Sequence, residues 1–274
     1  MKNFRFIVWC ILLLVPSLLC SAQTQMDSLT IVKAKWQKEK HAKGLKFMHA
    51  SFPSLYGAPQ DVYMVDVKLK KHTADVCTHK GRELTTIHAQ AEKAVAAING
   101  TFFDMRGGGS VCFVARKGNI DAWTGGGGGK PRSNGAIEME GKDVRIIPWT
   151  ADSEKNYNAA GKSIMVSGPL LMVNGKRERV DLQQGHDPAR HPRTAVMLTK
   201  KNHLLLIVVD GRHKGVAEGM TLSELEYFCN RLGATSALNL DGGGSSVLWT
   251  AKKGILNTPS DGKERTVANS ILVY

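Results

Sequence analysis

Short apolar segments separated by glycine-containing turns run through most of this chain, and this pattern constrains the fold more than any other feature. Such spacing predicts many short strands rather than a bundle of helices. Apolar residues alternate over residues 62–69, and the Asn174-Gly175 pair is a hairpin signal. Further strands are expected at residues 94–98, 111–115, 170–173, 194–199, 203–210, 237–240, 247–249 and 267–273.

Three segments have the patterns of helices. A basic amphipathic helix is expected over residues 28–43 and a second helix over residues 84–93. Thr221 and Glu224 form a capping box ahead of an apolar helical stripe, and Gly233 follows as a stop signal. This third helix lies between two predicted strands. We therefore predict an α+β fold: a single β-rich domain with a mixed sheet and a few packed helices.

The first 22 residues have the pattern of a secretory signal peptide. Lys2 and Arg5 precede an apolar run at residues 7–15, and the small residues of Cys20-Ser-Ala22 predict cleavage before Gln23. A retained membrane anchor is a weaker alternative because the apolar run is short for a span. A lipoprotein attached at Cys20 is also weaker, because a large residue precedes that cysteine.

The predicted organisation is therefore a signal peptide at residues 1–22, an N-terminal helical leader at 23–45 and one domain at 46–274. The expected location is secreted or periplasmic. No other apolar run is long enough to span a membrane. The oligomeric state is not predicted.

Net charge and composition exclude several classes of protein. The chain of 274 residues has a formal charge of +13, which falls to +11 when Lys2 and Arg5 leave with the signal peptide. Hydrophobic residues make up 42% of the sequence, which excludes a disordered chain. The lysines are dispersed without a basic–aromatic motif, which disfavours a nucleic-acid binder. The positive charge instead favours anionic substrates or surfaces.

Three cysteines remain after signal removal: Cys77, Cys112 and Cys229. Their odd number and wide spacing exclude a CxxC metal site and leave one disulfide open. We expect them to be buried as small apolar side chains.

Polar residues gather where three predicted strands end. Asn99 and Asp104 follow one strand, Asp210 and Arg212 follow another, and Asp241 follows a third. Strand ends hold loop residues rigidly, so such positions favour an active site. The candidates for carboxylate chemistry are Asp241, Asp210, Glu218 and Asp104.

The loop Asp241-Gly-Gly-Gly-Ser-Ser246 has the composition of an anion-binding site. Glycines let the backbone approach a ligand, and their N–H groups can form an anion-binding nest. Arginine side chains offer a planar fork to phosphate. The alternative is a tight turn capped by Asp241. The candidate binding residues are Asn99, Arg193, Thr194, Arg212, Gly242, Gly243, Gly244 and Ser245.

A metal site is not predicted. His186, His191 and His213 lack zinc-site spacing and are expected at the surface. No cofactor is expected to be required, although a divalent cation near Asp210 and Asp241 stays open. The five glycines at residues 125–129 predict a surface loop more strongly than a lid.

The ordered motifs together resemble the phosphodiester glycosidase family over roughly residues 60–274. Each motif alone is weak, and their order and spacing carry the resemblance. The matching segments are Asn99-Gly-Thr-Phe-Phe-Asp104, Ser167-Gly-Pro-Leu170, Pro192-Arg-Thr-Ala195, Val209-Asp-Gly-Arg212, Gly219-Met-Thr-Leu222, Asn239-Leu-Asp-Gly-Gly-Gly-Ser-Ser246 and Arg265-Thr-Val-Ala-Asn269.

The resemblance implies hydrolysis of the bond between a sugar's anomeric carbon and a phosphate oxygen, with N-acetylglucosamine as one candidate sugar. The candidate carboxylates would act at the anomeric carbon, and the arginines and glycine loop would stabilise the phosphate. The sequence does not assign acid, base or nucleophile among the four carboxylates. The main alternative is a non-catalytic protein of the same fold that binds a glycan or cell-envelope polysaccharide.

Overall fold

The computed structural model describes residues 24–125, 133–180 and 188–274. The predicted signal peptide, residues 126–129 of the glycine loop and His186 lie outside these ranges. No helix in the described ranges combines the length and the apolar character that a membrane span requires. The helical segments there are residues 24–32, α2 (Thr85–Ala91), α3 (Ala151–Lys155), α4 (Leu222–Arg231) and the 3₁₀ turn η2 (Gly243–Ser245).

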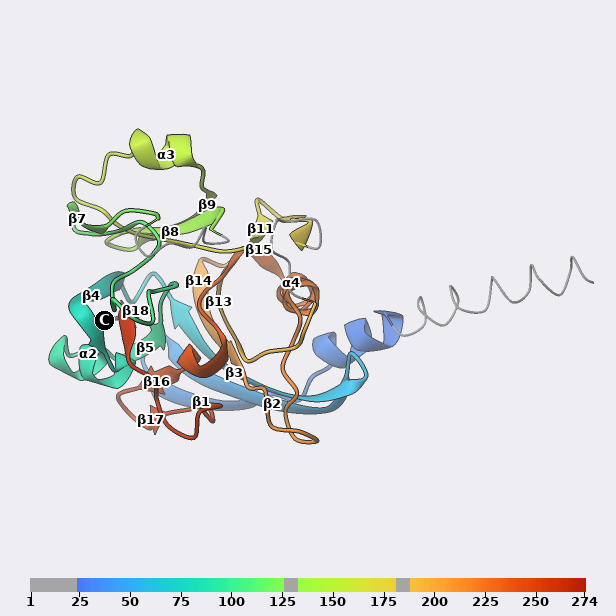
Figure 1. The fold of residues 1–274 in the computed structure, drawn as a ribbon. Helices are drawn as coiled ribbons and strands as arrows, with labels where there is room; N and C mark the ends of the chain where they lie inside the picture. The colour runs from blue at the N-terminus through green and yellow to red at the C-terminus, as the bar shows by residue number, and fades with distance from the viewer. Residues whose placement is uncertain (1–23, 126–132, 181–187) are drawn as a thin grey trace, which may run out of the picture.

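The largest sheet joins segments that are far apart in the sequence, between residues 37 and 239 (Figure 1). Its eight strands lie in the order β1 (Gln37–Ala42), β2 (Leu45–Leu55), β3 (Ala58–Lys68), β14 (His203–Val209), β13 (Arg193–Thr199), β15 (Ala234–Asn239), β11 (Leu170–Val173) and β12 (Lys176–Arg177). The predicted hairpin at Asn174-Gly175 is confirmed. It connects β11 to β12, and both residues have positive φ, as a tight two-residue turn requires.

Two five-stranded sheets complete the β-structure. One has the order β7 (Asn119–Ala122), β6 (Val114–Arg116), β10 (Ser163–Ser167), β8 (Gly135–Glu140) and β9 (Asp143–Pro148). The other has the order β17 (Gly254–Ile255), β16 (Leu248–Thr250), β5 (Ala96–Asn99), β18 (Val267–Val273) and β4 (Ala74–Glu83).

The predicted α+β class is confirmed, but the expected mixed sheet is wrong for the described residues. Every strand pair there is antiparallel. The helix α4 connects β14 to β15, which run in the same direction, but β13 lies between them and runs the other way. The strand β18 separates β4 from β5 in the same manner. In the described sheets, strands that run in the same direction are thus never adjacent.

One apolar core is shared by all three sheets, which makes the chain a single domain. Alternate side chains of β14 point into it, including Leu204, Leu206 and Val208. Ile137 of the second sheet and Ile271 of the third sheet belong to the same core. Because the period along a strand is two, the intervening residues of β14 face the opposite side of the large sheet.

The helix α4 covers that opposite side of the large sheet (Figure 1). The predicted capping box is confirmed: the Glu224 N–H donates to Thr221 Oγ1 at 3.1 Å, and the Thr221 N–H donates to Glu224 Oε2 at 2.9 Å. Leu225 and Phe228 are buried against the sheet, as the helical spacing predicts. This helix therefore fixes the segments at both of its ends, which lead into the site described below.

The predicted helix over residues 28–43 is wrong in its second part. Helix occupies residues 24–32, and β1 then pairs antiparallel with β2 around Gly44, whose φ is +89°. The Trp36 ring packs edge-on against Phe52 and Phe228, at centroid distances of 6.1 and 6.5 Å. This aromatic contact and the sheet edge outweigh the local helical pattern of the charged residues, because tertiary packing decides such ambiguous segments.

The three cysteines Cys77, Cys112 and Cys229 are buried free thiols, as the sequence predicts. Burial raises the pKa of the Cys77 and Cys112 thiols to about 11 and that of Cys229 to about 12. They are therefore neutral apolar side chains at physiological pH.

Candidate active site

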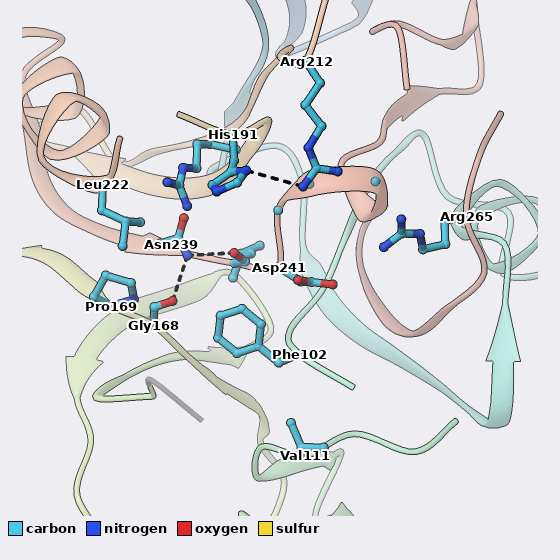
Figure 2. A pocket seen from close by; sticks show the side chains of 15 residues that line it. Phe102, Val111, Gly168, Pro169, His191, Arg212, Leu222, Asn239, Asp241 and Arg265 are labelled. Atoms are coloured by element: carbon cyan, nitrogen blue, oxygen red, sulfur yellow. Dashed lines mark hydrogen bonds between the residues drawn. The ribbon is translucent and has the colours of Figure 1, made fainter. Parts of the chain in front are cut away.

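A cavity of about 480 Å³ lies where the first residue of β13 and the last residue of β15 meet the loops that follow β5 and β10. Figure 2 shows the side chains that line it. The lining residues are Phe102, Val111, Gly168, Pro169, His191, Arg193, Arg212, Leu222, Asn239, Leu240, Asp241, Gly242, Gly243, Gly244 and Arg265. The cavity therefore collects residues from all seven of the ordered sequence motifs.

Asp241 is the one acidic residue among these described lining residues. It lies two residues after the end of β15, and its backbone is held on both sides. The Asp241 N–H donates to the Gly100 carbonyl at 3.0 Å, and the Asn99 side-chain amide donates to the Asp241 carbonyl at 2.7 Å. The carboxylate is thus presented to the cavity from a fixed backbone.

The environment of Asp241 disfavours its charged form. Burial raises the pKa of this carboxyl to about 6, although the nearby Ser245 hydroxyl, the Arg265 charge and the Gly242 N–H act in the opposite direction. Near neutral pH the group is mostly ionised, but it takes up a proton much more readily than an exposed aspartate. Carboxyls with shifted pKa values in clefts are common in catalytic sites.

The three glycines after Asp241 allow other segments to approach the loop closely. A side chain at Gly242 would lie 2.6 Å from the Pro192 carbonyl oxygen, and one at Gly244 would overlap the Arg265 and Asp261 side chains. Gly243 has φ +60°, and its N–H donates to Pro192 at 2.8 Å. The loop therefore needs glycine for packing against its neighbours, whatever ligand it binds.

Two arginines form a cationic side of the cavity. Arg212 is exposed, and its Nη2 lies 3.4 Å from His191 Nδ1 (Figure 2). Arg265 is held by Asp261, whose Oδ2 accepts from Arg265 Nε at 2.9 Å. Arg212 also has φ 64°, a backbone conformation that costs a non-glycine residue about 1 kcal/mol or more. The fold keeps this strained residue at the mouth of the cavity.

Arg193 has a different role from Arg212 and Arg265. It is buried, its Nε donates to the Met220 carbonyl at 2.7 Å, and its Nη2 donates to the Ala189 carbonyl at 3.1 Å. Its guanidinium thus ties the segment before β13 to the segment before α4. Thr194 is buried behind the cavity, where its hydroxyl donates to Asn99 Oδ1 at 3.0 Å. Ser245 is buried beside Asp241 and does not line the cavity.

An apolar wall faces Asp241 from the other side. In Figure 2, Phe102 lies on the side of Asp241 away from Arg212, with Pro169 beyond it. Val111 and Leu222 also line the cavity. The cavity thus has one cationic face and one apolar face, with Asp241 between them.

Asn239 lines the cavity with a side-chain amide that the surrounding backbone holds in place. Its Nδ2 donates to the carbonyl oxygens of Gly168 and Leu240, both at 2.8 Å, which fixes the orientation of the amide. Its Oδ1 is buried and has no hydrogen-bond partner in the described part of the chain. Buried acceptors are normally satisfied, so this oxygen is an exception, and it is covered by the surrounding protein rather than open to the cavity.

The other three candidate carboxylates lie outside the cavity lining. Asp210 is buried, and it accepts from the Thr258 N–H at 2.9 Å and from Asn257 Nδ2 at 3.1 Å. Burial raises the pKa of Asp210 to about 6, against the effect of these two donors. These contacts make Asp210 an anchor for the segment that follows β17.

Glu218 and Asp104 both stabilise turns. Glu218 accepts from the Gly215 N–H at 2.8 Å. Asp104 accepts from the Arg106 N–H at 2.9 Å, and hydrogen bonds from the Arg106 and Gly107 backbone lower its pKa. Neither carboxylate is brought to the cavity that contains Asp241.

Of the site residues expected from the sequence, the structure brings Asp241, Arg193, Arg212 and the three glycines to the cavity. Four other lining residues were not expected as site residues: Phe102, His191, Asn239 and Arg265. Asn239 and Arg265 lie inside the motifs that carry the family resemblance, which was the available signal. In the described residues no group of three or more His, Cys, Asp or Glu side chains is arranged to hold a metal ion. His191 instead contacts Arg212.

The fold and the cavity define an antiparallel α+β protein with one carboxylate in an arginine-rich pocket. The chain belongs to the phosphodiester glycosidase family, whose model matches residues 92–274. This confirms the family inferred from the ordered motifs. No curated protein matches the chain.

Solved structures share the fold at low sequence identity. The catalytic domain of zebrafish N-acetylglucosamine-1-phosphodiester alpha-N-acetylglucosaminidase, auto-inhibited by its pro-peptide, superposes with a TM-score of 0.68 at 19% identity, over 88% of this chain and 87% of that chain. A hypothetical protein from Synechocystis gives 0.68 at 16% identity, over 87% of this chain and 63% of that chain. A protein from Burkholderia pseudomallei gives 0.60 at 15% identity, over 78% and 74%.

Proposed function

We propose that this protein is a hydrolase that cleaves the glycosidic bond of a sugar-1-phosphodiester in the Asp241 cavity. The observation that carries this proposal is one ionisable carboxylate placed between an arginine face and an apolar face. The arginine face suits a phosphate, and the apolar face suits a sugar ring. The products would be a free sugar and a phosphomonoester.

The arginine face suits the phosphate of the substrate. Arg212 and Arg265 carry permanent positive charges, and their planar forks match phosphate oxygens. These charges would stabilise the negative charge that develops on the phosphate as it leaves the sugar. The Arg265 fork is already oriented by Asp261, so little rotamer entropy is lost on binding.

The apolar face suits a sugar ring. Aromatic side chains present a broad apolar surface, and Phe102 offers one opposite Asp241. Pro169, Val111 and Leu222 add further apolar surface to the same cavity. Together these residues would place the anomeric carbon near the carboxylate.

The chemical role best suited to Asp241 is that of a general base. Phosphate is a fair leaving group, so the bond from the anomeric carbon to the phosphate oxygen can break without strong acid assistance. The electron pair of that bond goes to the phosphate oxygen. Water then bonds to the anomeric carbon and gives a proton to the Asp241 carboxylate. A second carboxylate at the cavity is not required in this scheme.

Export from the cell is part of the proposal. It rests on the amino-terminal pattern of Lys2, Arg5 and the apolar run at residues 7–15. N-acetylglucosamine is the first sugar to test, because the zebrafish structure of similar fold is of an enzyme named for that sugar.

The test is turnover of sugar-1-phosphate diesters by purified protein. We expect free sugar from at least one member of a panel that contains N-acetylglucosamine, glucose, galactose and mannose diesters. Asp104→Asn is the matched control because it neutralises a carboxylate outside the cavity, and it should keep the activity that Asp241→Asn loses. Folded protein that binds these diesters without releasing sugar would instead indicate the glycan-binding alternative.

A further inference from the structure

Seven exposed lysines lie together at the end of the large sheet farthest from the Asp241 cavity. They come from four turns that are distant in the sequence. We call this surface the lysine end, and it consists of Lys43, Lys68, Lys70, Lys71, Lys142, Lys200 and Lys201.

Direct contacts join the four turns. The Lys68 N–H donates to the Gly44 carbonyl at 2.9 Å, beside Lys43. The N–H of the residue between Lys68 and Lys70 donates to the Asn202 carbonyl at 3.3 Å, which brings the turn at residues 200–202 alongside. Lys142 Nζ donates to the Lys70 carbonyl, also at 3.3 Å. The lysines therefore form one surface.

These positive charges are not balanced by neighbouring side chains. No ion pair to any of the seven lysines occurs within the described residues. Of the acidic side chains near these turns, Asp66 pairs with His203 at 2.7 Å and Asp143 lies 3.6 Å from Arg145. Glu140, exposed in the same turn as Lys142, leaves the seven lysines in clear excess. By contrast, Lys252 elsewhere on the surface pairs with Glu39 at 2.8 Å. Clustered like charges destabilise a fold unless an anionic partner neutralises them.

The lysine end and the cavity lie at opposite ends of the same strands. The strand β13 begins with Arg193 at the cavity and ends next to Lys200, and β14 returns from His203 to the loop of Arg212. Seven residues of extended strand span about 20 Å. The lysines therefore cannot contact a small ligand in the cavity, and they need a separate partner.

We propose that the lysine end docks this protein on an anionic lipid surface. The four turns contain no arginine fork and no Trp, Tyr or Phe, which are the side chains that read the shape of individual phosphates, bases or sugars. They also lack exposed large apolar side chains. Flexible ammonium groups at the tips of several turns match an extended layer of phosphate-bearing headgroups, to which juxtamembrane lysines are attracted additively.

This docking gives the molecule a defined orientation. The lysine end would face the lipid phosphates, and the cavity would lie at the other end of the strands, away from the membrane. The inference does not depend on the proposed hydrolase activity, because it uses none of the residues of the cavity.

The experiment is co-sedimentation of purified protein with two kinds of vesicle. One kind is pure phosphatidylcholine, and the other contains equal parts of phosphatidylcholine and phosphatidylglycerol. We expect selective binding to the anionic vesicles at low salt and its loss at high salt, because screening shortens the range of the attraction. Equal binding to both kinds of vesicle would overturn the proposal.

Two charge-matched variants locate the surface. The first combines K70Q, K71Q, K200Q and K201Q, and the second combines K35Q, K38Q, K176Q and K214Q, all exposed lysines elsewhere. Both lose four charges. The first should lose at least about tenfold in anionic-vesicle affinity, and the second should stay within about twofold of the unaltered protein. Unchanged melting temperatures would show that both variants are folded.

Two further results would overturn the proposal. Equal losses in the two variants would show that net charge alone drives binding. Retention on immobilised heparin at a salt concentration where anionic vesicles do not bind would point to a polyanionic polymer rather than a lipid surface.

Discussion

The side-chain amide of Asn99 donates a hydrogen bond to the backbone carbonyl oxygen of Asp241 at 2.7 Å. The oxygen of the same amide accepts from the Thr194 hydroxyl at 3.0 Å and from the Val247 N–H at 3.1 Å. One buried side chain thus joins β5, β13 and the residues on both sides of the glycine loop. Asn99 therefore positions Asp241 from behind the cavity.

Replacing Asn99 with alanine should lower kcat more than it changes KM. The substitution leaves the Thr194 hydroxyl and the Val247 N–H without their acceptor, which should cost about 2 kcal/mol of stability. It also frees the Asp241 backbone. Steady-state kinetics with a sugar-1-phosphate diester and a denaturant titration measure the two effects. Thr194→Val is the matched control, because it removes one donor and keeps the Asp241 contact. An increase in KM alone would show that Asn99 binds substrate directly.

Activity should fall as the pH drops through the Asp241 pKa of about 6. A general base works only when ionised, so the rate should decrease about tenfold per pH unit below that value and level off above it. Arg265→Gln removes a positive charge that lowers this pKa, so it should move the acid limb to higher pH. A rate that instead rises with acidity would make Asp241 a general acid.

Asp241→Asn should abolish turnover without loss of stability. The pKa of this carboxyl is higher in the folded state than in the unfolded state, so the fold favours the protonated form. The contribution of Asp241 to folding stability therefore declines as the pH rises from about 4 to about 6 and stays low above that. The neutral amide avoids this penalty, and the melting temperature at neutral pH should be unchanged or higher. A large drop in melting temperature would support the tight-turn alternative, in which Asp241 caps the loop.

Asp261→Asn should weaken substrate binding. Asp261 holds the Arg265 guanidinium over Gly244, although it does not line the cavity itself. Losing a charge-assisted hydrogen bond should raise KM and the inhibition constant of inorganic phosphate by about tenfold, with a smaller change in kcat. Gly244→Ala should give a similar result because a side chain there displaces the same pair. The control is Asp121→Asn, which neutralises an exposed aspartate elsewhere. An equal rise in KM in this control would exclude a specific role for Asp261.

Asp210→Ala should unfold more easily but keep its activity per folded molecule. It leaves the Thr258 N–H and Asn257 Nδ2 without an acceptor in a buried position, which should cost about 2 kcal/mol. A denaturant titration measures the loss, and Glu218→Gln should change stability much less because that residue is half-buried. Complete inactivation of Asp210→Ala with normal stability would instead place Asp210 in the chemistry.

The sequence predicts the elements whose local signals agree with one another. The capping box of Thr221 and Glu224 and the hairpin at Asn174-Gly175 depend only on neighbouring residues, and both are confirmed. The segment at residues 37–42 was ambiguous, because charged residues suit both an exposed helix face and an edge strand. Only its pairing with β2 and the packing of Trp36 decide for the strand.

The candidate site is predictable only in part, for a similar reason. Asp241, Arg212 and the glycines lie at strand ends, which is a local signal. Arg265 reaches the cavity through the loop that precedes β18, and Phe102 through the loop after β5, so their positions depend on tertiary packing. Sequence position also does not separate Asp210, which holds a neighbouring loop, from Asp241, which faces the cavity.

The most direct test of the central claim is hydrolysis of a sugar-1-phosphate diester in water enriched in heavy oxygen. Mass spectrometry then shows which product takes up the label. Cleavage between the anomeric carbon and the phosphate oxygen predicts the heavy oxygen in the free sugar and none in the phosphomonoester. Label in the phosphomonoester would mean that water attacks phosphorus, and it would contradict glycosidic cleavage at Asp241.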